Sequence, residues 1–267
     1  MHFLHLYGIE KMITDIIQKE TLASTNDYAR EYSAHITPDP GHLTVITARQ
    51  QTKGRGQQGN SWESEDGKNL LFSILCHPLY IKAHEQYVIS AAIALAVSET
   101  VKESLGAPYS DCISIKWPND IYYKEKKMGG ILIENDLSGS SIQNCIIGVG
   151  LDVNQVVFTS NAPNPISMTN ISGTEYCCTN LLNSIITKFA QFLEMLKTDS
   201  ETAKEQIFAD YMKILFRNDG SLHRYKDADG EFMARISSVD RTGRITLIDS
   251  DGTLRRYEFK ELAFYFS

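Results

Sequence analysis

The spacing of apolar and polar residues divides the chain into a long first part and a short second part. In the first part, apolar runs rich in β-branched residues predict strands at 42–48, 70–76, 113–117, 130–134 and 145–153. Apolar residues at helical spacing predict helices at 85–105, 181–196 and 201–215. Residues 11–20 carry a short apolar group and residues 154–178 show no clear period, and no element is predicted in either stretch.

After residue 216 the pattern changes to short alternating segments. They span 230–237, 244–249 and 253–259, and turn residues such as Asp-Gly separate them. Alternation with tight turns is typical of β-hairpins. The sequence therefore predicts a small antiparallel barrel that follows a larger domain of helices and strands.

Composition narrows the class of protein. Of the 267 residues, 42% are hydrophobic and 22% are charged, which is typical of a globular chain. The net charge of −7 argues against a general nucleic-acid binder, which needs a basic face. The five cysteines lack zinc spacing, residues 1–8 do not resemble a secretory signal, and no apolar run reaches the length of a membrane span. We therefore expect a cytoplasmic protein with reduced thiols and no membrane partner.

A glycine-rich stretch at 53–62 is the first candidate for chemistry. Gly54, Gly56 and Gly59 allow backbone N–H groups to approach a ligand, and Arg55 adds donors for phosphate or carboxylate. The glycine spacing at 54–59 matches the G-x-G-x-x-G fingerprint of dinucleotide-binding proteins. That fingerprint needs a helix directly after the glycines, and here a long polar loop follows instead. Two interpretations remain, a mobile basic surface loop or a loop that folds over an anionic ligand with Trp62 as an apolar wall.

Two further motifs combine lysine with turn residues. Lys-Trp-Pro-Asn-Asp at 116–120 ends a predicted strand, and Lys-Met-Gly-Gly follows at 127–130. Each motif alone is consistent with an ordinary turn. Together, Lys116 and Lys127 offer positive charge and Asp120 offers a carboxylate. No Ser-His-Asp or Cys-His pattern stands out, so we expect chemistry by positioning and charge stabilisation rather than by a covalent nucleophile.

Ser24, Thr25 and Asn26 precede a short helix that should end before Pro38. At least one of the three is expected to cap that helix, because Ser, Thr and Asn accept backbone N–H bonds at helix starts. The other two would then be free to face a ligand.

Taken together, these motifs resemble the biotin protein ligases. The match runs closely from 21 to 154. It comprises Ser24-Thr25-Asn26, Gln51, Gly54-Arg55-Gly56, Gly59, Trp62, Lys116-Trp117-Pro118-Asn119-Asp120, Lys127-x-Gly129-Gly130-Ile131-Leu132-Ile133-Glu134 and Gly148-x-Gly150-Leu151. The resemblance implies an α+β fold, with a mixed-sheet catalytic domain flanked by helices at 1–216 and a small SH3-like barrel at 217–267.

The same resemblance implies an activity, its substrates and its partners. Such a ligase activates biotin with ATP and Mg²⁺ to biotinyl-5′-AMP and then transfers biotin to one lysine of a biotin carboxyl carrier protein domain of acetyl-CoA carboxylase or a related carboxylase. No tightly bound prosthetic group and no protein metal site are expected. Few residues precede Ser24, so we expect no DNA-binding domain, and the oligomeric state is either a monomer or a homodimer.

The implied site residues fall into three overlapping groups. Biotin would be bound by Ser24, Thr25, Asn26, Gln51, Arg55, Gly56, Gln57, Lys127, Gly129 and Gly130. ATP and the adenylate would be bound by Arg55, Gln57, Trp62, Lys116, Asn119, Lys127 and Asn154. Catalytic roles are implied for Lys116, Lys127, Arg55 and Asp120.

Some residues depart from the family pattern. Many members have arginine where this chain has Gln57 and basic residues at Gln58 and Asn60, so this loop is expected to hold the adenylate less tightly or to rely more on its backbone. Asp152 stands where asparagine is common. Two alternative functions remain open at this point. One is a lipoate–protein ligase or related acyl transferase, and the other is a non-catalytic ligand-binding module.

Overall fold

The structure is a computed structural model that describes residues 12–159 and 164–266. Within these residues, seven strands form one mixed sheet in the order β1-β2-β3-β7-β6-β5-β4. Its strands are β1 (Ile13–Leu22), β2 (His42–Gln51), β3 (Leu70–Cys76), β4 (Ile113–Lys116), β5 (Asp120–Tyr123), β6 (Lys126–Ser138) and β7 (Ser141–Leu151). β1 runs parallel to β2, and the other neighbours are antiparallel. The expectation about a secretory signal at residues 1–8 lies outside the described residues.

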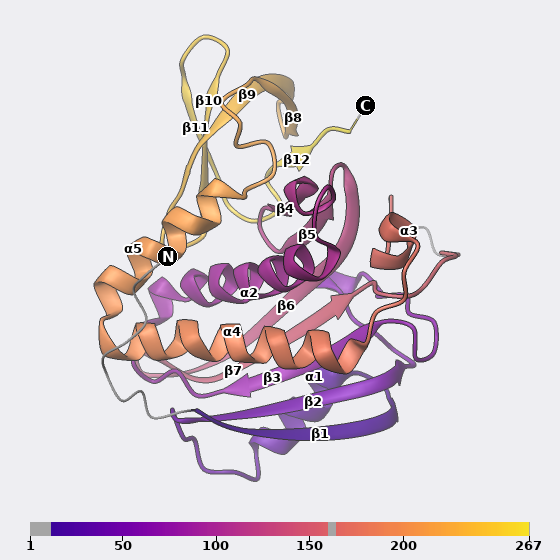
Figure 1. Ribbon diagram of the computed structural model, residues 1–267. Helices are drawn as coiled ribbons and strands as arrows, with labels where there is room; N and C mark the ends of the chain where they lie inside the picture. Colours follow the sequence, from indigo (N-terminus) through magenta and orange to yellow (C-terminus); the bar gives the residue numbers. More distant parts are fainter. Residues whose placement is uncertain (1–11, 160–163, 267) are drawn as a thin grey trace.

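Helices cover both faces of this sheet. The helices α2 (Tyr87–Leu105), α4 (Cys178–Thr198) and α5 (Ser200–Lys213) pack on one side, and α1 (Thr25–Ser33) lies on the other (Figure 1). Neighbouring strand residues therefore enter different cores. Val45 packs in the large cluster under α2 and α4, whereas Ile46 packs against Ala29 of α1. This alternation follows from side chains pointing to opposite faces along a strand.

The second sheet contains five strands within the described residues, in the order β11-β10-β9-β8-β12. They are β8 (His223–Asp227), β9 (Gly230–Val239), β10 (Ile245–Asp249), β11 (Leu254–Tyr257) and β12 (Ala263–Phe264). The sheet stands at one end of the larger sheet, beyond α5 (Figure 1). The three alternating segments of the sequence are confirmed as β9, β10 and β11. The SH3-like assignment and the division at residue 216 stay predictions.

Several elements were not predicted, among them β1, the short strands β5, β8 and β12, and the helix α3 (Met168–Ser172). β1 is an edge strand with both Ile13 and Ile16 exposed, so it lacks the buried alternation by which strands are recognised. The short helix α3 lies in a stretch without a period, where Ser167 caps it and Gly173 ends it at a φ of 74°. The mixed α+β architecture itself is confirmed. Among the described residues, no helix is long and apolar enough to cross a membrane.

Candidate functional site

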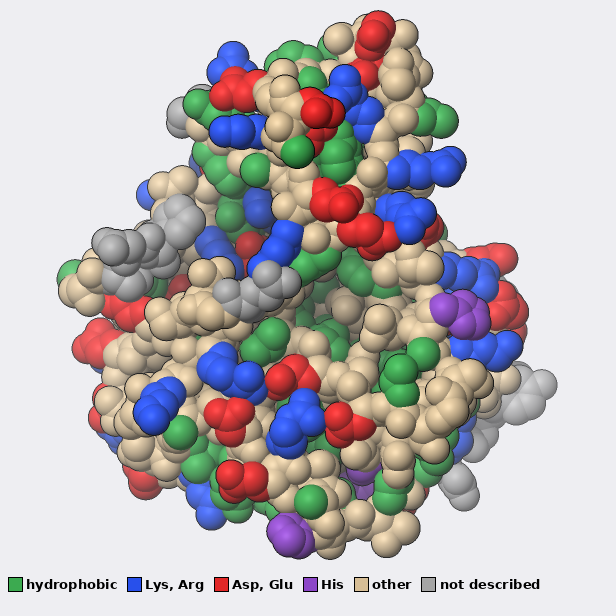
Figure 2. All heavy atoms as spheres, turned by 180° about the vertical axis from the view of Figure 1, so that it is seen from behind, with side chains coloured by type: hydrophobic (Ala, Val, Ile, Leu, Met, Phe, Trp, Pro, Cys, Tyr) green, Lys and Arg blue, Asp and Glu red, His purple; other side chains and the backbone are tan. Residues whose placement is uncertain are grey.

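A cavity of about 300 Å³ lies where the motifs of the sequence meet. It is bordered by the start of α1, the end of β2, the glycine-rich loop, the segment 116–120, β6, β7 and residues 259–264 of the second sheet. Figure 2 views the molecule from behind and shows a hollow below the C-terminal sheet, with basic and acidic side chains around it. Segments that are far apart in the sequence therefore build one site.

The polar end of the cavity is built on the first residues of α1. Ser24 caps the helix by accepting the N–H of Asp27, as predicted for one of the three residues. Thr25 donates its backbone N–H to Gln51 Oε1 at 2.7 Å, and Asn26 donates from Nδ2 to Glu134 Oε2 at 2.9 Å. The Asn26 bond, together with a bond from Thr25 Oγ1 to Gln51 Oε1 at 3.2 Å, fixes the two side chains that capping leaves free to line the cavity.

Ser73 lies beneath this polar end. Its Oγ is 2.7 Å from Thr25 Oγ1 and 2.6 Å from Asn26 Oδ1, and the side chain is fully buried. Gly148 on β7 leaves room for Asn26, because a Cβ there would lie only 2.2 Å from Asn26 Oδ1. Buried polar groups in close contact hold a fixed set of donors and acceptors, which suits recognition of a small polar ligand.

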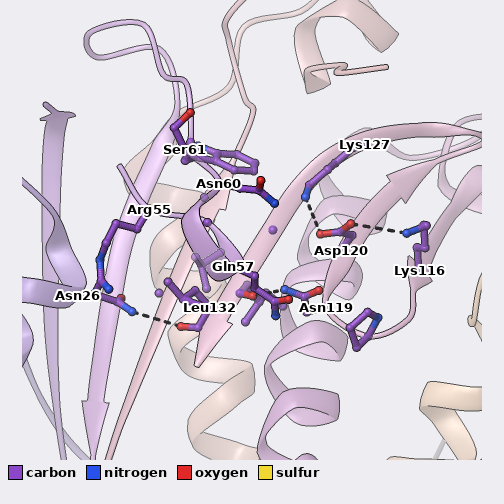
Figure 3. A pocket seen from close by; sticks show the side chains of 18 of the residues that line it. Asn26, Arg55, Gln57, Asn60, Ser61, Lys116, Asn119, Asp120, Lys127 and Leu132 are labelled. Carbon is purple, nitrogen blue, oxygen red and sulfur yellow. Dashed lines mark hydrogen bonds and ion pairs between the residues drawn. The ribbon is translucent and has the colours of Figure 1, made fainter. Parts of the chain in front are cut away.

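The glycine-rich loop forms a narrow hairpin over the cavity. Trp62 donates its backbone N–H to Gly54 O at 2.9 Å, and the 3₁₀ turn Gln57–Gly59 forms its tip. Arg55 points toward the polar end, where its Nη2 lies 2.7 Å from Asp27 Oδ1 and 3.0 Å from Glu134 Oε2 (Figure 3). An anionic ligand would have to compete with these two carboxylates for the guanidinium. The expected closure of the loop over bound ligand stays a prediction.

The Trp62 ring closes the middle of the cavity against β6 and β7. A Cβ on Gly150 would lie 2.5 Å from the ring, so glycine is needed for this close approach. The indole Nε1 is buried and has no hydrogen-bond partner among the described residues. Buried donors are normally paired, so this N–H is available to an acceptor on a ligand.

The opposite end of the cavity holds a carboxylate between two ammonium groups. Asp120 Oδ1 lies 2.6 Å from Lys127 Nζ, and Asp120 Oδ2 lies 3.9 Å from Lys116 Nζ (Figure 3). Burial lowers the pKa of Lys116, and the Asp120 carboxylate opposes that shift. Lys116 also lies over the Phe264 ring, 4.8 Å from its centroid. This end therefore concentrates positive charge in a partly desolvated position.

Residues 19–152 match the model of the biotin/lipoate A/B protein ligase family. The chain belongs to this family. It is 26% identical over 254 residues to the bifunctional ligase/repressor BirA of Bacillus subtilis, an alignment that covers 93% of this chain and 74% of that protein. It is also 36% identical over 120 residues to the biotin–protein ligase of Homo sapiens, covering 44% of this chain and 16% of that protein.

Solved structures agree with the fold. A biotin protein ligase from Aquifex aeolicus in complex with biotin and ATP gives a TM-score of 0.75 at 23% identity, covering 95% of this chain and 99% of that chain. A biotin protein ligase from Leishmania major in complex with biotinyl-5-AMP gives a TM-score of 0.63 at 24% identity, covering 92% of this chain and 99% of that chain. The α+β fold of the biotin/lipoate ligase family is thereby confirmed.

Most of the residues that the family resemblance implied are brought together. The residues of that set that line the cavity are Ser24, Thr25, Asn26, Gln51, Arg55, Gly56, Gln57, Trp62, Lys116, Asn119, Asp120, Lys127 and Gly130. Asn119 donates to Ile131 O and accepts from Ile131 N, so it joins the segment 116–120 to β6. Their individual roles stay predictions.

Gly129 and Asn154 lie outside the residues that line the cavity. Gly129 packs on Gly150 O, where a Cβ would lie 3.1 Å away. Asn154 is held by Tyr176 and Thr169, because its Nδ2 donates to Tyr176 O and its Oδ1 accepts from Thr169 Oγ1. In this structure Asn154 stabilises the stretch before α4, and its assignment to the adenylate stays a prediction.

Sequence reasoning missed Ser73, which supports the lining residues Thr25 and Asn26 from beneath, and a second group that lines the cavity itself. Ser73 was overlooked, although a lone hydroxyl in an apolar strand was a usable signal. The second group comprises Phe264 of β12 and three residues of the connection between β11 and β12, which are Phe259, Lys260 and Leu262. No periodicity or motif could assign these residues to the site, because only the packing of the second sheet brings them there.

Asp152 is a buried carboxyl close to the cavity-lining Lys127. It is 4% exposed, and its Oδ1 has no hydrogen-bond partner among the described residues. Burial raises its pKa well above the usual range, although the Lys127 ammonium opposes that shift. Within residues 12–159 and 164–266, no group of three or more His, Cys, Asp or Glu side chains is placed to hold a metal ion.

Proposed function

We propose that the protein is a biotin–protein ligase, which converts biotin and ATP into biotinyl-5′-AMP and pyrophosphate and then transfers biotin to a lysine of a carrier protein. The observation that carries this proposal is the pair of contrasting ends in one cavity. A fixed polar end on α1 suits the uncharged ring of biotin, and the Lys116–Asp120–Lys127 end suits phosphate. Membership of the biotin/lipoate ligase family supports the same reaction.

In the first step, a biotin carboxylate oxygen attacks the α-phosphorus of ATP. A new P–O bond forms while the bond to the leaving pyrophosphate breaks. Lys116 and Lys127 would stabilise the negative charge that builds on the phosphate oxygens. The partly desolvated position of Lys116 strengthens such an interaction relative to water. Mg²⁺ enters with ATP as the counter-ion of its phosphates and belongs to the substrate.

In the second step, the neutral amine of the carrier lysine attacks the acyl carbon of biotinyl-5′-AMP. The C–O bond to AMP breaks, and the amine loses a proton. Asp120 is a suitable acceptor for that proton, since its carboxylate lies inside the cavity between the two lysines. Asp120 can accept the proton only if its 2.6 Å ion pair with Lys127 lengthens, which would happen when the Lys127 ammonium pairs with phosphate instead.

Recognition of biotin falls to the polar end. Thr25, Asn26 and Gln51 present amide and hydroxyl groups, and the Trp62 ring supplies an apolar wall with a free N–H. Arg55 and the backbone at Gly56 would take the biotin carboxylate and the phosphate beside it. The carrier domain of a biotin-dependent carboxylase is the expected protein partner, and the cytoplasm is the expected location.

Biotin-dependent exchange of labelled pyrophosphate into ATP tests the proposal. We expect exchange with biotin and none with lipoate, and we expect Lys127→Ala to reduce it about a hundredfold or more. Lys126→Ala is the matched control, because Lys126 is the exposed neighbour on the same strand and does not line the cavity. Exchange with lipoate alone would favour a lipoate ligase, and absence of exchange with any acid would favour a binding module.

A further inference from the structure

The segment 116–120 is held from outside the cavity by the second sheet. The Trp117 ring is 2% exposed, and its Nε1 donates to Gly243 O at 2.8 Å. Gly243 lies in the turn between β9 and β10, 126 residues further along the chain. A buried indole N–H needs an acceptor, so this bond fixes where Trp117 can sit.

A second bond reaches the next residue of the segment. Tyr87, at the start of α2, donates from its hydroxyl to Pro118 O at 3.0 Å. The Tyr211 hydroxyl of α5 lies 2.8 Å from the Tyr87 hydroxyl. Because the Tyr87 proton is directed to Pro118 O, Tyr211 must be the donor in the bond between the two tyrosines. Tyr211 therefore orients the hydroxyl that holds Pro118.

Gly243 and Tyr87 are also in direct contact with each other. A Cβ on Gly243 would lie 2.4 Å from the Tyr87 ring, and its φ of +93° disfavours any other residue. The turn that accepts the Trp117 N–H thus packs flat on the tyrosine that donates to Pro118. Both holding bonds therefore lie beside this one contact.

Ion pairs anchor the same turn. Arg241 Nη1 lies 2.8 Å from Glu201 Oε2 and 3.4 Å from Glu85 Oε1. The buried Lys204 joins these two acids, with its Nζ 2.8 Å from Glu85 Oε2 and 3.0 Å from Glu201 Oε1. Glu85, just before α2, two residues of α5 and the turn between β9 and β10 therefore converge next to Tyr87.

From this geometry we infer that Tyr87 and Gly243 are positioning residues for the adenylation step, which place Lys116 and Asp120 by holding Trp117 and Pro118 between them. This inference rests on the proposed function. Lys116 and Asp120 flank the held pair in the chain, so a shift of Pro118 moves the charged groups that face the phosphate. Transition-state stabilisation falls steeply with such displacements.

Two tyrosine variants separate positioning from general stability. Tyr87→Phe removes both the bond to Pro118 and the bond to Tyr211, whereas Tyr211→Phe removes only the bond between the tyrosines. Both changes keep the rings that fill the core. We expect Tyr87→Phe to lower kcat of biotin-dependent pyrophosphate exchange about tenfold while KM for biotin is unchanged. We expect kcat of Tyr211→Phe to stay within about threefold of wild type. The melting temperatures of the two variants should shift by similar amounts.

Hydrogen exchange at residues 119–122 gives a readout that does not depend on activity. We expect faster exchange there in Tyr87→Phe than in Tyr211→Phe. Equal kcat in the two variants, or equal exchange at 119–122, would overturn the positioning role even if wild type is an active biotin ligase. A wild type without pyrophosphate exchange would instead overturn the proposed function, and the hydrogen exchange would still decide whether Tyr87 holds the segment.

Discussion

Lys127 and Asp120 form an ion pair, 2.6 Å between Nζ and Oδ1, at the end of the cavity opposite α1. The same carboxylate lies 3.9 Å from Lys116. Asp120 thus balances two ammonium groups before any phosphate is bound. ATP would replace this carboxylate as their counter-charge, which leaves Asp120 able to accept a proton in the transfer step.

The first prediction concerns the pH dependence of Asp120→Asn. Burial lowers the pKa of Lys116 and Asp120 partly restores it, so removing the carboxylate lowers that pKa further. Since Lys116 must be protonated to stabilise phosphate, activity is lost as the pH rises through its pKa. The alkaline limb of kcat/KM for ATP should therefore move to lower pH in Asp120→Asn, measured by pyrophosphate exchange. Asp229→Asn, in an exposed turn, should leave the limb in place, and an unmoved limb in both variants would contradict the assignment.

The second prediction concerns Arg55→Glu. This change places a third carboxylate beside Asp27 and Glu134, which now pair with the guanidinium. The biotin carboxylate and the adenylate phosphate would then meet repulsion instead of attraction. We expect release of labelled biotinyl-5′-AMP to become about tenfold to a hundredfold faster in a filter-binding assay. Lys53→Glu carries the same charge change on an exposed residue of the same loop, and equal release from both variants would count against Arg55.

The third prediction concerns Gln57→Arg. Gln57 lines the cavity at the tip of the glycine-rich loop, where many members of the family carry arginine. A guanidinium there would add charge-assisted hydrogen bonds to the phosphate of the adenylate. We expect release of biotinyl-5′-AMP to slow about threefold to tenfold. The gain should shrink at high salt if it is electrostatic; unchanged release at low salt would show that the loop holds the adenylate through its backbone.

The fourth prediction concerns Gly148→Ala. The new Cβ would lie 2.2 Å from Asn26 Oδ1, so Asn26 must leave its contacts with Ser73 and Glu134. We expect the dissociation constant for biotin to rise about tenfold or more by titration calorimetry. Gly41→Ala is the control, because its nearest neighbour atom would be 3.4 Å away. Normal biotin binding by folded Gly148→Ala would remove Asn26 from the biotin site.

The fifth prediction concerns Asp152→Asn. The native pKa of Asp152 is raised by burial, so the unfolded chain ionises first as the pH rises. Asp152 therefore costs stability above its unfolded pKa of about 4, and the cost grows until the native pKa is reached. Asparagine cannot ionise, so the variant should gain unfolding free energy at pH 7, by about 1.4 kcal/mol for each unit by which the native pKa exceeds the unfolded one, and much less at pH 4. Denaturant unfolding at both pH values measures this, and a pH-independent difference would be the contrary result.

Much of the fold could be predicted because its central elements are apolar in the way their geometry requires. All seven residues of β3 are buried, and α2 is apolar nearly all round, so both were recognised from the sequence. The edge strand β1 could not be, since its stability comes from backbone pairing with β2 rather than from a buried face. Strands β8 and β12 are short and were missed for a similar reason.

The residues of the candidate site also fall into a group that could be predicted from the sequence and a group that could not. Residues within motifs, such as Lys116 and Arg55, could be predicted because each motif is a short run that is visible in the sequence itself. Lys260 and Phe264 could not, because they reach the cavity only through the docking of the second sheet. The Arg55 ion pairs could not be predicted either, since Glu134 is 79 residues away in the chain.

The polar end of the cavity joins Asn26 of α1, Ser73 of β3 and Gly148 of β7. If the polar end binds biotin as proposed, a partly folded chain that lacks any of these elements has no biotin site, and biotin would bind the native state alone. Binding of this kind stabilises by mass action, and a ligand at a hundred times its dissociation constant adds about 2.7 kcal/mol. Biotin is therefore expected to protect the protein from thermal unfolding, by an amount that rises with the logarithm of its concentration above the dissociation constant.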